Sequence, residues 1–130
     1  MSVLGELQPN KVFKYFEEIC SIPHGSRNLQ QISDYLVDFA KAHELKYRQD
    51  EDLNVIIWKD GSKGYEASEP VILQGHMDMV AVKEADCDKD MEKEGLDLEI
   101  NGDYISAKGT SLGGDDGIAV AYTLAVLDDE

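Results

Sequence analysis

The sequence predicts an α/β domain with a mixed sheet, because segments with helical apolar spacing and segments typical of strands follow one another along the chain. Its 130 residues are the usual length of one domain. Hydrophobic residues make up 42% of the chain, which is enough for a packed core. We expect two helices, three strands, a hairpin and a final helix, in that order.

Three segments have apolar residues at the spacing of a helix. The first helix is expected over residues 9–20, with Pro9 in its first turn. Ser26 offers an N-cap for a second helix that extends to about His43. The final helix is expected over residues 117–129. Apolar stripes support the first two helices, namely Val12, Phe13, Phe16 and Ile19 in one and Leu29, Ile32, Leu36, Phe39 and Ala40 in the other.

Five short segments are expected to form strands, at 45–49, 53–59, 70–75, 98–100 and 104–106. Residues 71–73 are three consecutive apolar residues, which is typical of a strand that is buried on both faces. Asn101-Gly102-Asp103 separates the last two segments and predicts a hairpin turn.

The chain is strongly acidic, with 27 acidic and 12 basic residues and a formal net charge of -15. Phosphate groups require Lys and Arg for their neutralisation, so nucleic acid and anionic membranes are poor partners for this chain. The acidic residues serve either solubility or the binding of cations. No apolar run approaches the ~20 residues that span a bilayer.

Cysteine usage and the first residues favour a cytoplasmic protein. Cys20 and Cys87 lie far apart without a CxxC pair, which argues against a disulfide framework or a thiolate zinc site. Cys20 lies among apolar residues and is expected in the core. The first residues show no basic segment followed by an apolar stretch, so we expect no signal peptide.

The first group of residues that could carry chemistry is Gln74-Gly75-His76-Met77-Asp78, at the end of the expected buried strand. Ligand-binding residues of open α/β sheets gather at the carboxyl ends of strands. His76 and Asp78 are two residues apart, so their side chains lie on the same side of an extended chain. A carboxylate commonly orients a metal-binding imidazole. The alternative is a solvated or core histidine.

The second group surrounds Asp115 and Asp116, which stand among four glycines at the expected start of the final helix. Acids at this position ordinarily cap a helix and complement its dipole. One cap needs only one acid, however, and a rigidly held carboxylate could bridge two cations. The loop lacks the Lys-Ser/Thr ending of a phosphate-binding loop.

Two further features are expected to have no catalytic role. Residues 86–90 begin like a calcium loop, but Met91 stands where a glycine is needed and Asp97 where a bidentate Glu is expected. A solvated acidic loop explains them better. His24 follows Pro23 in the break between the first two helices, where we expect a structural or surface role.

Three segments in this order resemble the aminoacyl-histidine dipeptidases, also called cytosol non-specific dipeptidases. The segments are residues 19–24, 71–80 and 108–119. This group is part of a larger family of dimetal aminoacylases, carboxypeptidases and aminopeptidases. The resemblance extends over essentially all 130 residues and implies a mixed-sheet, zinc-exopeptidase-like (phosphorylase/hydrolase-like) catalytic domain, of which residues 1–130 are the N-terminal part.

The resemblance also implies an activity and a role for each site residue. The activity is hydrolysis of dipeptides, Xaa-His among them, by a water held between two zinc ions, with Mn²⁺ or Co²⁺ as alternatives. His76 resembles a terminal zinc ligand, and Asp78 resembles the catalytic acid that orients it. Asp115 resembles the carboxylate that bridges both metals and is often followed by an unusual peptide bond. Asp116 is assigned no ligand role.

The remaining parts of such an active site are expected C-terminal to Glu130. They are the general-base Glu, two acidic ligands, a distal histidine ligand and an inserted domain that mediates dimerisation, so a homodimer is expected for the full-length protein. The 130-residue chain alone is expected to bind zinc weakly and to lack peptidase activity. The alternatives are a stand-alone interaction module and an acidic metal-binding module that uses Asp86, Asp88 and Asp90.

Overall fold

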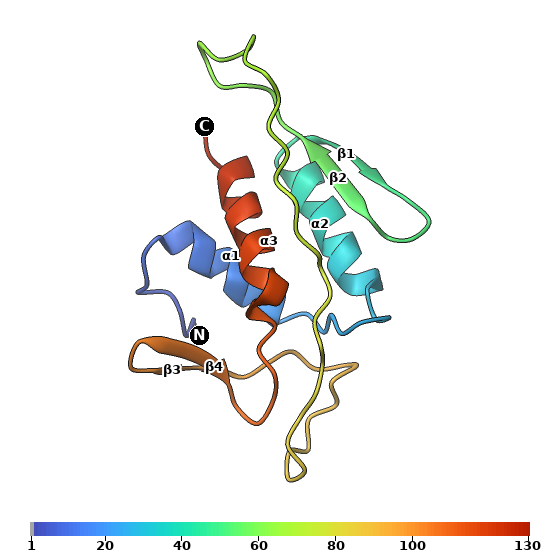
Figure 1. The fold of residues 1–130 in the computed structure, drawn as a ribbon, viewed down its shortest axis with the longest axis vertical. Helices are drawn as coiled ribbons and strands as arrows, with labels where there is room; N and C mark the ends of the chain where they lie inside the picture. The colour runs from blue at the N-terminus through green and yellow to red at the C-terminus, as the bar shows by residue number, and fades with distance from the viewer. Residues whose placement is uncertain (1) are drawn as a thin grey trace.

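The computed structural model describes residues 2–130 and arranges them as three helices with two small sheets at their periphery (Figure 1). Helices α1 and α3 pack against each other, while α2 packs against the first sheet. No helix of the described residues is both long and apolar enough to span a bilayer. The elements in chain order are α1 (Asn10–Cys20), α2 (Gln30–Ala42), β1 (Lys46–Gln49), β2 (Val55–Trp58), β3 (Leu98–Asn101), β4 (Tyr104–Ala107) and α3 (Gly114–Leu127).

The core lies between the helices and includes most of the predicted apolar stripes. Cys20 is buried there, as predicted. The rings of Tyr15 and Phe39 meet edge to face at 5.5 Å and connect α1 with α2. Apart from the partly buried Phe13 and Leu29, the stripe residues are buried: Val12, Phe16, Ile19, Ile32, Leu36, Phe39 and Ala40.

The prediction that Ser26 caps the second helix is wrong. Helix α2 begins at Gln30, and Leu29 at the N-cap position makes no side-chain capping hydrogen bond. Arg27 has φ 70°, which lies in the left-handed region and cannot continue a right-handed helix. The Ser26 hydroxyl donates instead to Asp78, so this side chain belongs to the candidate site.

The predicted mixed sheet is not present among residues 2–130. Strands β1 and β2 form one antiparallel pair, and β3 and β4 form another. The hairpin predicted at Asn101-Gly102-Asp103 is confirmed, with Asn101 opposite Tyr104 and Gly102 at φ 61°.

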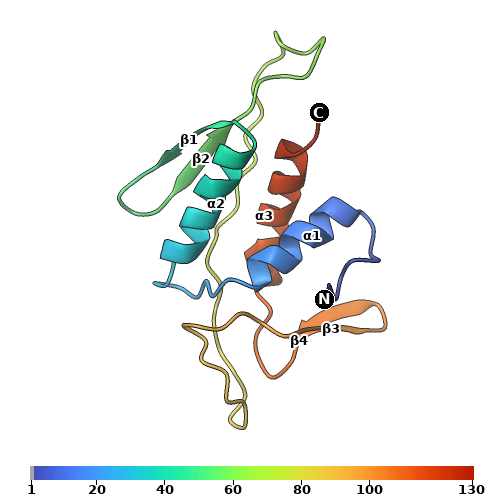
Figure 2. The same ribbon diagram turned by 180° about the vertical axis from the view of Figure 1, so that it is seen from behind.

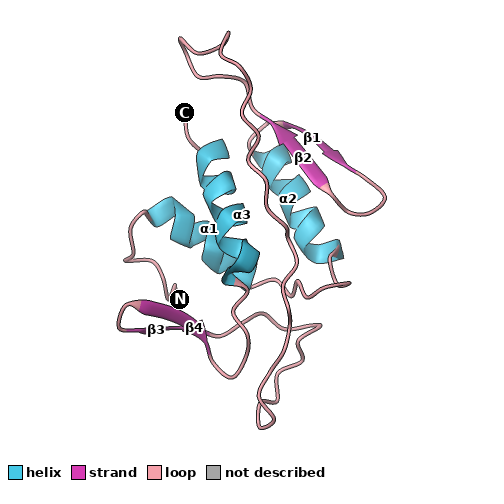
Figure 3. Ribbon diagram, in the orientation of Figure 1, coloured by secondary structure: helices cyan, strands magenta, loops and turns pink. Residues whose placement is uncertain are grey.

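The segment predicted as a buried strand, residues 70–75, is not a strand in this structure. It lies in the long loop region between β2 and β3, which passes the helices from end to end (Figures 2 and 3). Val71 is 83% exposed and Ile72 is 88% exposed. A strand needs neighbours for its backbone N–H and C=O groups, and no described segment forms a ladder with this one. Residues 71–73 are therefore an exposed apolar segment whose backbone forms no ladder with another strand.

We expect this exposed apolar segment to make the 130-residue chain self-associate, because contiguous apolar surface with unpaired backbone groups promotes association. The double variant Val71→Lys, Ile72→Glu should raise the monomer fraction in sedimentation velocity. Tyr104→Ser, which removes an exposed aromatic residue in β4, serves as the control and should not change the fraction. A wild-type chain that stays monomeric at all accessible concentrations would contradict this expectation.

Asp128 ties the three helices together directly after α3. Its carboxylate accepts a hydrogen bond from the Tyr15 hydroxyl at 2.6 Å and lies 3.1 Å from Nε2 of His43. The Lys11 ammonium donates to its backbone oxygen at 3.1 Å. The hydrogen bond from Tyr15 lowers the pKa of Asp128, and burial of the phenol raises the pKa of Tyr15.

Asp128→Ala should destabilise the chain by about 1–2 kcal/mol at pH 7, the range for lost hydrogen bonds to a partly solvent-screened charge. Because folding lowers the pKa of Asp128, its contribution is present above the unfolded pKa of about 3.9 and is lost as the pH falls. Urea denaturation at pH 7 and pH 3 should show the difference shrinking in acid. Asp129→Ala removes an equal charge but none of these hydrogen bonds, and an equal loss in that control would refute the assignment.

Candidate metal site

The imidazole of His76 lies between two carboxylates that come from distant parts of the chain. Its Nδ1 is 3.0 Å from Oδ1 of Asp78, and its Nε2 is 3.0 Å from Oδ1 of Asp115, 39 residues further on. The structure thus brings together the three side chains that the sequence analysis selected. A neutral imidazole can donate from only one ring nitrogen. The second carboxylate therefore calls for either a second proton on the ring or a cation between Nε2 and Asp115.

The start of α3 aims Asp115 at the imidazole. Gly113, the N-cap residue, has φ 75°, and Asp115 and Asp116 have non-helical backbone angles inside the first turn. The peptide bond between these two acids is cis, which confirms the unusual bond predicted after Asp115. The side chain of Asp115 is 93% exposed, so it is directed away from the helix and accessible to a ligand.

Asp116 contacts the backbone rather than the imidazole. Its Oδ2 accepts a hydrogen bond from the backbone N–H of His76 at 3.3 Å. The same oxygen is 3.0 Å from the position that a Cβ on Gly75 would occupy. Asp116 thus holds the start of α3 against residues 75–76, and the sequence analysis missed this role.

Ser26 is the second contact that sequence reasoning missed. Its hydroxyl donates to Oδ2 of Asp78 at 2.6 Å, while the other carboxylate oxygen faces His76. Backbone hydrogen bonds fix this arrangement, from Met79 N–H to the His24 oxygen and from Ser26 N–H to the Met79 oxygen, both at 3.0 Å. Ser26 and Asp78 are 52 positions apart, so no local sequence pattern could indicate the contact.

The charges of the site reinforce one another. The hydrogen bond from His76 to Asp115, followed by the contacts with Asp78, raises the pKa of the imidazole above its ordinary value. The hydrogen bond from Ser26, followed by the contact with His76, lowers the pKa of Asp78. The pair of carboxylates therefore favours positive charge at this point. A cation that binds Nε2 must compete with a proton, so its affinity should rise with pH.

The other two candidates lie outside this site. His24 is 3% exposed, its Nδ1 lies 2.7 Å from the backbone oxygen of Ile22, and burial lowers its pKa, in agreement with a structural role. Within residues 2–130, no three His, Cys, Asp or Glu side chains form a complete metal-binding group, neither at His76 nor at residues 86–90. In residues 86–90, Asp90 binds the backbone N–H of Glu92. The solvated acidic loop at residues 86–90 stays a prediction.

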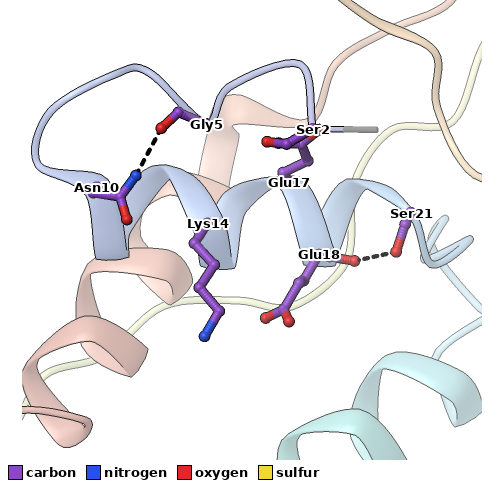
Figure 4. A pocket seen from close by; sticks show the side chains of 7 residues that line it. All are labelled: Ser2, Gly5, Asn10, Lys14, Glu17, Glu18 and Ser21. Carbon is purple, nitrogen blue, oxygen red and sulfur yellow. Dashed lines mark hydrogen bonds between the residues drawn. The ribbon is translucent and has the colours of Figure 1, made fainter.

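A pocket of about 410 Å³ lies beside α1 and is separate from His76 (Figure 4). Several of its polar groups already have hydrogen-bond partners within the chain. The carboxylate of Glu17 accepts hydrogen bonds from Ser2, Val3 and Leu4, and the Ser21 hydroxyl donates to the Glu18 backbone oxygen. The His76 group therefore remains the candidate site. The pocket is lined by Ser2, Gly5, Asn10, Lys14, Glu17, Glu18 and Ser21.

The donor atoms of the His76 site suit zinc. Zinc prefers imidazole nitrogen, thiolate and carboxylate oxygen, and bonds of 2.0–2.2 Å in a tetrahedron place N and O ligands about 3.4 Å apart. The observed separation of Nε2 and the Asp115 oxygen is 3.0 Å, within a few tenths of an ångström of this value. Catalytic zinc ordinarily has three protein ligands. Nε2 of His76 and the Asp115 carboxylate provide two such donors, fewer than a catalytic zinc requires.

Comparison with known proteins shows that this chain is similar to dipeptidases, which confirms the predicted resemblance. It is 41% identical over 130 residues to the cytosol non-specific dipeptidase of Escherichia coli (strain K12), an alignment that covers 100% of this chain and 27% of that protein. The crystal structure of the aminoacylhistidine dipeptidase from Vibrio alginolyticus matches with a TM-score of 0.94 and 38% identity, over 98% of this chain and 26% of that one. No protein-family model matches the chain. The chain therefore spans about a quarter of the length of these relatives.

Proposed function

We propose that residues 1–130 are the N-terminal part of the zinc-exopeptidase-like catalytic domain of a cytoplasmic, metal-dependent dipeptidase. The observation that carries this proposal is the His76 imidazole held between Asp78 and Asp115, each at 3.0 Å. The relatives, both named as dipeptidases, support peptide hydrolysis as the reaction and dipeptides, Xaa-His among them, as the substrate class. The full-length protein is proposed to be a homodimer.

Each of the three side chains has a distinct proposed role. Nε2 of His76 is a terminal zinc ligand, and Asp78 accepts the proton on Nδ1, which fixes the ring orientation and strengthens the nitrogen as a donor. Asp115, exposed at the start of α3, presents a carboxylate that can bridge two ions. Bound zinc, or Mn²⁺ or Co²⁺ in its place, supplies the Lewis acidity that activates water near neutral pH and polarises the scissile carbonyl.

The 130-residue chain alone should bind zinc weakly and lack peptidase activity. His76 and Asp115 provide one terminal ligand and one shared bridge, fewer than the three protein ligands of a catalytic zinc. Isothermal titration that gives a nanomolar site would contradict the first expectation. Metal-dependent cleavage of β-alanyl-histidine or Gly-His by the isolated chain would contradict the second.

A chimera tests the proposed function directly. These 130 residues would replace the aligned quarter of the Escherichia coli relative, and dipeptide hydrolysis would be measured with added zinc. The chimera should be active, and His76→Ala or Asp115→Ala should each reduce kcat/KM by at least about a hundredfold. Asp88→Asn is the matched control, because it neutralises an exposed acid in the loop at residues 86–90.

The same variants separate the alternatives when hydrolysis is measured in the chimera and metal binding in the isolated chain. A chimera that keeps full activity after His76→Ala and Asp115→Ala would refute the assigned metal site. Loss of zinc or calcium binding in Asp88→Asn, with no change in the His76 and Asp115 variants, would favour the acidic metal-binding module. An isolated chain that binds no metal at all would favour an interaction module.

A further inference from the structure

The side chain of Asp78 has two oxygens with two different partners. Oδ1 is 3.0 Å from Nδ1 of His76, whereas Oδ2 accepts the hydroxyl of Ser26 at 2.6 Å. The χ2 torsion of an aspartate is broad and roughly two-fold, so the carboxylate does not hold one orientation by itself. A short hydrogen bond to one oxygen fixes the plane of the carboxylate and therefore the position of the other oxygen.

Backbone hydrogen bonds to Met79 hold Ser26 in place. Residues 24–26 and 79 lie side by side in a parallel bridge between Gly25 and Met79. Two hydrogen bonds of 3.0 Å close this bridge, one from Met79 N–H to His24 and one from Ser26 N–H to Met79. A Cβ on Gly25 would come within 2.8 Å of the Ala81 Cβ, so the two segments are in close contact. Ser26 is thus held by backbone hydrogen bonds to the segment that directly follows Asp78.

We infer that Ser26 is a positioning residue of the metal site, which holds Asp78 so that Asp78 can orient His76. The inference rests on the proposed function, since it concerns the same imidazole. The contacts run from Ser26, in the loop after α1, through Asp78 to the imidazole of His76. The Ser26 hydroxyl donates to Asp78 and lies 3.4 Å from the Met79 oxygen, so its effect on His76 passes through Asp78.

Zinc affinity measured with a double-mutant cycle tests this inference. Zinc alone is titrated into the 130-residue chain, and the ring signals of His76 are followed by NMR, which is practical because the chain has three histidines. Asp78→Ala should weaken zinc binding roughly tenfold or more, the usual effect of losing a partner of a metal ligand. Ser26→Ala should weaken it roughly threefold to tenfold, and Ser26→Thr, which keeps the hydroxyl, should restore it to within about twofold.

The cycle distinguishes a positioning role from a merely structural one. If Ser26 acts through Asp78, then Ser26→Ala should cause no further loss in the Asp78→Ala background. The control is Ser21→Ala, which removes a hydroxyl with an equally short hydrogen bond, 2.6 Å to Glu18, away from the site. It should leave zinc affinity unchanged, and circular dichroism should show the same fold in every variant.

Each contrary result has a separate meaning. Unchanged affinity in Ser26→Ala, or an additive loss in the double variant, would overturn the role of Ser26 while leaving the metal site intact. A Ser26→Ala chain that loses its circular-dichroism signal would show that Ser26 stabilises the fold, which also overturns it. If His76→Ala and Asp115→Ala do not weaken zinc binding, the proposed function itself fails.

Discussion

Gly113→Ala should destabilise the chain by about 2–5 kcal/mol and abolish measurable zinc binding. Gly113 has φ 75°, a left-handed conformation that costs an alanine about 1–2 kcal/mol. The new Cβ would also lie 2.9 Å from Cβ of Met79, and forced overlap in a packed region costs about 1–3 kcal/mol. Met79 is 3% exposed and is hydrogen-bonded to His24 and Ser26, so it cannot move aside alone.

The expected displacement would separate Asp115 from His76, because Gly113 precedes Asp115 by two residues at the start of α3. Urea denaturation gives the loss of stability, and a zinc titration by NMR gives the loss of binding. The control is Gly114→Ala, since a Cβ there meets nothing within 4 Å and no positive φ is required. A Gly113→Ala chain as stable as the Gly114→Ala chain would contradict the described packing.

Leu124→Ala should destabilise the chain by about 2–5 kcal/mol, the range for truncating a fully buried leucine. Leu124 is 1% exposed and belongs to the core where α3 packs against α1. Because α3 also carries Asp115, a loosened helix should weaken zinc binding as well. The matched control is Val126→Ala on the same helix, where the side chain is 54% exposed and the change should stay within about 0.5 kcal/mol.

Thermal or urea denaturation measures both α3 variants. Equal losses in Leu124→Ala and Val126→Ala would show that α3 is not packed as described. A large loss in Leu124→Ala with no loss in Val126→Ala would agree with the described core.

The sequence predicted the elements that depend on local pattern. The apolar periods of α1 and α2 correspond to buried faces, and Asn101-Gly102-Asp103 forms the expected hairpin turn. The prediction that residues 70–75 form a buried strand was wrong, because burial depends on neighbouring segments that an apolar run does not specify. Ser26 was misassigned because caps are predicted from residue type alone, and the left-handed φ of Arg27 cannot be read from the sequence.

In the candidate site, too, the local features were predictable from the sequence and the long-range contacts were not. His76 and Asp78 could be paired from their spacing of two residues, and Asp115 from its glycine-rich surroundings. His76 and Asp115 are 39 residues apart, and the 3.0 Å distance between Nε2 and the Asp115 oxygen depends on the tertiary fold. The contacts of Ser26 and Asp116 were not predicted because each partner lies far along the chain, at separations of 52 and 40 residues.

The most direct test of the account is to locate zinc in crystals of the chain by anomalous diffraction at the zinc absorption edge. We predict an anomalous peak between Nε2 of His76 and the Asp115 carboxylate, at about 2.0–2.2 Å from each. Nδ1 of the same ring should remain in contact with Asp78. A peak at Asp86, Asp88 or Asp90 with none at His76 would contradict the assigned metal site.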